Sequence, residues 1–144
     1  MAKGYLIIET RADHPGVTRI RATEQLADPD SPSSSGEADT KVHFVARFGN
    51  VFVARMHAHT ALRRQTLDAE AGLYRVDPAT AVAAIDAIDL GHEPIYLDPE
   101  VASDPGIGRD TARRRRNHRL VDRVFNGAGA AAVISLVLLA LLGI

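Results

Sequence analysis

Residues 124–144 carry no charged side chain and directly follow the most basic stretch of the chain. At a rise of 1.5 Å per residue they would form a helix about 31 Å long, close to the roughly 30 Å hydrocarbon core of a bilayer. Their large aliphatic side chains outweigh the small cost of inserting Asn126, Ser135 and the glycines. A buried helix of a water-soluble core would show polar residues at a 3.6-residue period, and none follows Ser135. This segment therefore predicts a single C-terminal transmembrane helix.

The charge of the chain separates an acidic part from a basic part. Residues 1–108 contain ten Lys and Arg against 16 Asp and Glu, and residues 109–144 contain seven Arg against two Asp, which together give the net charge of −1. Basic residues beside a span tend to stay in the cytoplasm, and residues 1–8 lack the apolar stretch of a signal peptide. We expect a single-pass protein of the bacterial inner membrane with its N-terminal head in the cytoplasm. The lack of cysteine is compatible with that compartment.

The composition divides the chain into four segments. Residues 1–100 have the length of one domain, and within them residues 24–40, rich in Ser, Pro and acidic side chains, predict a mobile loop. Residues 101–109 contain Pro and Gly and are expected to be a linker. Residues 110–123 predict a basic juxtamembrane helix, with Asp110 as its N-cap, that continues into the anchor.

Two β-hairpins are predicted in the head. Residues 3–10 and 16–23 flank a turn with Asp, Pro and Gly, and the second of them alternates apolar and polar side chains. Residues 41–60 predict another hairpin around a Gly-Asn turn. Pairing Phe48 with Phe52 places the apolar residues of both arms on one face, so this register is favoured over the one set by the Gly-Asn turn alone.

One helix has clear start and stop signals. Asp77 is a good N-cap, Pro78 suits the first helical position, and the helix is expected to run through residues 79–90 to a stop at Gly91. Residues 95–97 lie near two prolines and predict an edge strand. The predicted fold class is therefore α+β, with a small, largely antiparallel sheet and one or two helices.

Three histidines are weak candidates for a metal site. In the favoured register of the second hairpin, His43 lies across from His57, and His59 shares a face with His57. Three imidazoles would then converge, although the sequence offers no clear fourth ligand. The simpler interpretation is that these histidines are exposed, and we expect no metal and no cofactor.

No catalytic residue is predicted. The sequence has no nucleophile motif of the G-x-S-x-G type, and without cysteine the thiol enzymes are excluded. Four acidic residues near the second half of the head could act as general acids or bases, but no spacing pairs them; they are Asp86, Asp89, Glu93 and Asp98.

The basic stretch next to the anchor predicts contacts with anionic lipid. It lies within about ten residues of the span, where headgroups supply the phosphates that a nucleic acid would otherwise offer, so no nucleic acid is expected as a partner. The expected headgroup ligands are Arg113, Arg114, Arg115, Arg116 and Arg119. Part of this cluster could instead pair with carboxylates of a neighbouring subunit.

Small residues recur along one side of the predicted anchor. Gly127, Ala131 and Ser135 are four residues apart, which leaves a nearly flat ridge where another helix can approach closely. The leading hypothesis is a non-catalytic, single-span accessory subunit of a larger membrane protein complex. The alternatives are a membrane-tethered regulatory module that binds a soluble cytoplasmic partner through its head, and a small metal-binding protein or enzyme that uses the histidines.

Overall fold

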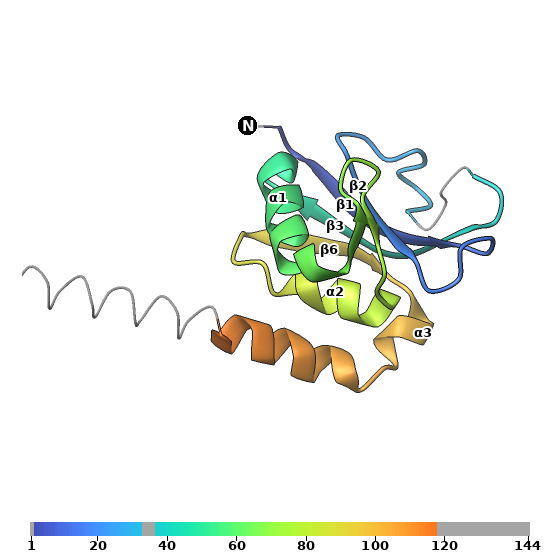
Figure 1. Ribbon diagram of the computed structural model, residues 1–144. Coiled ribbons are helices and arrows are strands. Elements are labelled where there is room, and N and C mark those ends of the chain that lie inside the picture. The colour runs from blue at the N-terminus through green and yellow to red at the C-terminus, as the bar shows by residue number, and fades with distance from the viewer. Residues whose placement is uncertain (1, 33–36, 118–144) are drawn as a thin grey trace, which may run out of the picture.

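An antiparallel sheet with the strand order β4-β5-β2-β1-β3-β6 forms the centre of the computed structural model, which describes residues 2–32 and 37–117. The helices lie on one face of this sheet (Figure 1). The strands are β1 (Gly4–Arg11), β2 (Thr18–Thr23), β3 (Thr40–Phe48), β4 (Thr66–Asp68), β5 (Leu73–Tyr74) and β6 (His92–Leu97). The helices are α1 (Val51–Ala61), the short 3-10 helix η1 (Arg63–Gln65), α2 (Pro78–Asp86), α3 (Pro99–Ala102) and a further helix over residues 106–117. The predicted α+β class with a small antiparallel sheet is confirmed.

The predicted anchor, residues 124–144, lies outside the described residues. So do Arg119 and the three small residues of its ridge, Gly127, Ala131 and Ser135. Within residues 2–32 and 37–117, no helix combines the length and the apolar character needed to cross a membrane.

The first predicted hairpin is confirmed. β1 and β2 pair antiparallel, with Leu6 opposite Ala22 and Ile8 opposite Ile20. These residues face the helices, because alternate residues of a strand point to the same side. Arg19 therefore lies on the other face of the sheet, as the alternation predicted.

The second predicted hairpin is wrong. Its first arm is β3, but its second arm is the helix α1, so Phe48 and Phe52 do not pair across a turn. β3 instead lies between β1 and β6 in the sheet. The predicted opposition of His43 and His57 is lost with the hairpin.

Asn50 explains why the chain turns into a helix at this point. It is the N-cap of α1, and its side-chain oxygen accepts a hydrogen bond from the Val53 backbone N–H at 3.2 Å. The residues of α1 that face the core are Val51, Ala54 and Ala58, a three- and four-residue spacing that matches a helix. Asn after Gly suggests a hairpin turn from sequence alone, but here its side chain caps a helix.

The predicted helix at Asp77 and Pro78 is confirmed, although it is shorter than expected. The Asp77 carboxylate accepts the Thr80 backbone N–H at 2.9 Å, and Pro78 is the first residue of α2. The helix ends at Asp86, with Ala87 as its C-cap, instead of extending to Gly91. The predicted edge strand is also confirmed, since β6 pairs with β3 at one end of the sheet.

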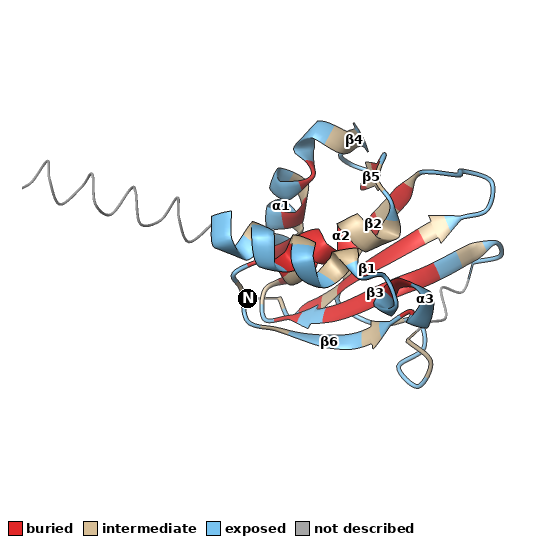
Figure 2. Cartoon of the chain, turned by 90° about the horizontal axis from the view of Figure 1, so that it is seen from below, coloured by how far each residue is buried: buried red, intermediate tan, exposed pale blue. Residues whose placement is uncertain are grey.

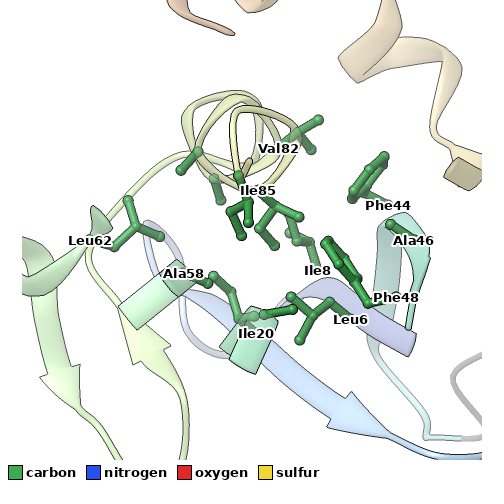
Figure 3. Packing of buried hydrophobic residues seen from close by; sticks show 14 of the residues in the cluster. Leu6, Ile8, Ile20, Phe44, Ala46, Phe48, Ala58, Leu62, Val82 and Ile85 are labelled. Carbon is green, nitrogen blue, oxygen red and sulfur yellow. The ribbon is translucent and has the colours of Figure 1, made fainter. Parts of the chain in front are cut away.

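The main core fills the space between the sheet and the helices. Figure 2 shows its buried residues along the central strands and on the helix faces that cover them. Figure 3 shows part of this packing, in which side chains of α1, α2 and three strands meet. Its largest fully buried members include Leu6, Ile8, Phe48, Leu62 and Ile85.

A smaller cluster covers the opposite face of the sheet. Ile7, Val42 and Val45 are buried there, and Leu26 packs on them from the segment predicted as a mobile loop. Glu9 lies on the same face with only 2% of its surface exposed. Its carboxylate is 3.4 Å from Arg19 Nη1 and 3.6 Å from Arg21 Nε, so the buried charge is compensated.

The predicted linker at residues 101–109 is mostly helical. α3 extends into it, and a further helix begins at residue 106 instead of at Asp110. Asp104 accounts for the earlier start, because its carboxylate accepts the Gly106 backbone N–H at 2.7 Å. The basic helix therefore begins four residues earlier than predicted and follows α3 almost directly.

Candidate functional site

The basic helix over residues 106–117 is docked on the head. It lies alongside α2 (Figures 1 and 2), where Arg115 Nη2 donates a hydrogen bond to the Asp86 carbonyl oxygen at 2.7 Å. The same nitrogen is 3.6 Å from an Asp86 carboxylate oxygen. Ile107 packs against the main core, and Thr111 is buried. This helix is thus part of the folded domain.

Docking divides the arginine cluster into two groups. Arg115 is held by the C-terminal end of α2, a negative helix end that favours a cation. Arg113 and Arg116 are exposed on the outer side of the helix, and Arg114 is half-buried. The predicted role in binding headgroups therefore fits Arg113 and Arg116 best, whereas Arg115 already has a partner within the chain.

A groove of about 590 Å³ lies where the end of this helix meets α1 and α2. Asn117, the last described residue, forms part of its wall together with Thr60 of α1 and Ile88 just beyond α2. Arg63, His57 and Asp89 add polar groups to the wall. The end of the basic helix is therefore placed beside the C-terminal half of α1.

The outer side of α1 carries two large apolar residues that the core does not use. Phe52 is 53% exposed and Met56, one turn later, is 68% exposed. Both were predicted to lie with the other apolar residues on one face of a hairpin, and this prediction is wrong because the segment is a helix. Thr60, a further turn along, is exposed and shared with the groove. The four-residue spacing of these positions was the sequence signal for this surface.

A second polar cluster joins β1, β3 and the start of α3. The His43 ring is buried and lies between two partners, with Nε2 2.7 Å from the Thr10 hydroxyl and Nδ1 3.0 Å from Asp98 Oδ2. Lys41 Nζ is 3.2 Å from the same Asp98 oxygen and 2.6 Å from a Glu100 carboxylate oxygen. This cluster was not predicted, because its members are up to 90 residues apart in the sequence.

The protonation of this cluster follows from burial and hydrogen bonding. Burial lowers the pKa of His43, and the neighbouring Asp98 only partly offsets it. Burial would raise the pKa of Asp98, but the hydrogen bonds from the Glu100 N–H, Lys41 and His43 hold it below its usual value. A neutral His43 donates a hydrogen bond from Nδ1 to the ionised Asp98. Its Nε2 accepts a hydrogen bond from the Thr10 hydroxyl.

The order hydroxyl, imidazole, carboxylate is that of a hydrolytic triad, yet these groups also account for the local fold. Asp98 is the N-cap of α3, where it accepts the Glu100 backbone N–H at 3.1 Å. The His43 carbonyl oxygen accepts the Asp98 N–H at 2.8 Å. The cluster therefore links the residue that follows β6 to β3 by hydrogen bonds, and it caps the start of α3.

The structure does not bring the three metal candidates together. His43 is in the cluster with Asp98, whereas His57 and His59 are on α1, and His59 Nδ1 lies 3.3 Å from the Tyr74 hydroxyl. In the part of the chain that the structure describes, no three His, Asp or Glu side chains are arranged to hold a metal ion. The predicted convergence depended on the second hairpin, which does not form.

Comparisons with known protein families, with curated proteins and with solved structures gave no match to this chain.

Proposed function

We propose that this protein is a non-catalytic, single-span accessory subunit of a larger membrane protein complex. The observation that carries the proposal is the docking of the basic helix on the head, with Arg115 on Asp86. That helix leads in sequence to the apolar residues 124–144, which have the length and composition of a membrane span.

The short distance between head and anchor supports a subunit more than a long-range tether. Only residues 118–123 separate Asn117 from the apolar segment, and six residues span at most about 20 Å even when fully extended. Because residues 106–117 are packed on α2, only these six residues can lengthen the connection between the head and the anchor. The head is therefore held close to the bilayer, where it can cover or contact integral membrane partners.

Two groups of side chains have proposed roles in the membrane. Arg113 and Arg116, together with Arg119, lie at the level of anionic headgroups. The ridge of Gly127, Ala131 and Ser135 packs against a helix of a partner subunit, because small residues allow two backbones to approach closely. The head faces the cytoplasm of a bacterial inner membrane, in keeping with the arginines beside the span.

The alternative is a membrane-tethered module that recruits a soluble partner. One observation favours it: β6 is an edge strand whose Ile95 and Leu97 are 36% and 38% exposed. An edge with apolar side chains is a known site of strand addition by a partner peptide. Pro94 in the same strand cannot donate a backbone hydrogen bond and so limits such pairing.

The two functions differ in what they require of the anchor. We expect the native protein to stay in the membrane fraction after an alkaline carbonate wash and to purify in mild detergent with integral membrane proteins. Replacing residues 124–144 by an unrelated span should abolish this co-purification, whereas a simple tether would tolerate the exchange. A detergent-extracted protein that runs as a lone monomer would contradict the subunit proposal.

A further inference from the structure

The outer side of α1 is an amphipathic surface without a partner in the described structure. Phe52 and Met56 lie one helical turn apart and point away from Ala54 and Ala58, which face the core. A single exposed apolar residue needs no explanation, but two at this spacing form a continuous strip. The strip leads to Arg63 and Arg64, both exposed, at the end of α1.

The position of Asn117 relates this strip to the proposed anchor. Asn117 shares the groove with His57, Thr60 and Arg63, so the basic helix ends beside α1. In Figure 1, helix 106–117 runs toward the side of the molecule where α1 lies, and α1 stands crosswise to it. If helix 106–117 points toward the bilayer, α1 lies along the bilayer surface.

Arginine side chains lie at the C-terminal end of the strip. Arg63 and Arg64 extend from η1, and Arg116 is exposed near the end of the basic helix. Asp89 is the acidic residue among those that line the groove. Apolar side chains flanked by arginines are the pattern of a helix that lies in the headgroup region of a membrane.

We propose that the outer side of α1 and the turn η1 rest on an anionic lipid surface, with Phe52 and Met56 in the interfacial region and Arg63 and Arg64 on lipid phosphates. This inference rests on the proposed anchor and goes beyond it, because it assigns the head a defined orientation. Helix 106–117 then stands steeply on the membrane, and the β1–β2 turn is remote from it.

Single-cysteine labels can test this orientation, since the full chain contains no cysteine. The full-length protein would be reconstituted in phosphatidylcholine vesicles with and without phosphatidylglycerol, and labelled with an environment-sensitive fluorophore at Met56→Cys. Because Met56 is mostly exposed, this change leaves the core intact. Controls are Gly108→Cys, exposed near the start of the basic helix where a Cβ meets nothing within 4 Å, and Ala12→Cys, exposed in the β1–β2 turn.

We expect a blue shift at position 56 and quenching by brominated lipid in anionic vesicles, with neither effect at positions 12 and 108. The paired substitution Arg63→Ser and Arg64→Ser should weaken the lipid contact roughly fivefold for each charge removed. Quenching at 108 and not at 56 would overturn the inference, because the basic helix would then lie flat. Equal signals at all three positions would also overturn it.

The same vesicles separate this inference from the proposed function. Release of the protein by alkaline carbonate would refute the anchor itself. Retention in the vesicles without quenching at position 56 would leave the anchor standing and refute only the orientation of the head.

Discussion

His43 Nδ1 lies 3.0 Å from one carboxylate oxygen of Asp98, while the other oxygen of that carboxylate accepts the Glu100 N–H at 3.1 Å. One side chain therefore caps α3 and orients a buried imidazole on β3. The two residues are 55 positions apart in the sequence, and the stability of their contact depends on pH.

The stability of the head should fall as the pH drops below the ordinary histidine pKa of 6.5. Burial lowers the pKa of His43 in the folded state, so the unfolded state binds more protons in this range and stability rises with pH. The lowered pKa of Asp98 adds a second loss below its ordinary value of 3.8. Thermal unfolding followed by circular dichroism should show both stages. His43→Gln should remove the loss of stability that begins below pH 6.5. If that loss is unchanged in the variant, another group causes it.

Loss of the Asn50 cap should destabilise the protein without unfolding it. Asn50→Ala removes the side-chain acceptor for the Val53 N–H, which typically costs about 1 kcal/mol. Asn50→Asp keeps an acceptor at the same position and should cost much less. Urea denaturation of both variants measures the difference in the free energy of unfolding. Equal losses would show that the cap hydrogen bond is not the cause.

Two glycines with similar backbone angles should respond very differently to alanine. Gly16 and Gly72 have φ values of 77° and 68°, which cost an L-residue roughly 1–2 kcal/mol. A Cβ at Gly16 meets nothing within 4 Å, whereas one at Gly72 would lie 2.3 Å from the Ile20 carbonyl oxygen. Gly72→Ala should therefore lower the free energy of unfolding well beyond Gly16→Ala, as measured by urea denaturation. Similar losses would mean that the backbone angle alone decides.

Arg115→Ala should loosen helix 106–117 from the head. It removes the hydrogen bond to the Asp86 carbonyl oxygen, and because Arg115 is half-exposed we expect a cost of about 1 kcal/mol. Hydrogen exchange of the helix amides should accelerate roughly fivefold, since local opening follows local stability. Arg113→Ala is the matched control, exposed on the same helix. Equal acceleration in both variants would show that the contact with Asp86 does not hold the helix.

The elements predicted correctly have signals within a few residues. The hairpin of β1 and β2 shows alternation and a turn, and α2 shows an N-cap followed by proline. The segment 51–61 was assigned to the wrong class because its apolar residues fit a two-residue period as well as a helical one. Phe52 and Met56 alternate with Ala54 and Ala58 and so complete an apolar pattern with a two-residue period, although in the helix their side chains are exposed.

The candidate site was only partly visible in the sequence. The arginine cluster is visible in the composition. Its place on a helix was predictable because no proline follows Pro105. Its docking was not, because Arg115 meets Asp86 from 29 residues away. The contact of His43 with Asp98 is also long-range, and no local pattern indicates such pairs. Both depend on the sheet order, which short-range signals do not determine.

The docked helix also determines how the head would respond to force. A pull on the chain beyond Asn117 reaches this helix at its C-terminal end, so it loads Arg115 first, then Thr111 and finally Ile107. Contacts that are loaded in this order break one after another, and this needs a lower force than breaking all of them at once. Each residue released and straightened lengthens the chain by up to about 2 Å, the difference between an extended and a helical rise. The hydrogen bond between Arg115 and Asp86 is thus the first contact that must break before a pulling force separates helix 106–117 from α2.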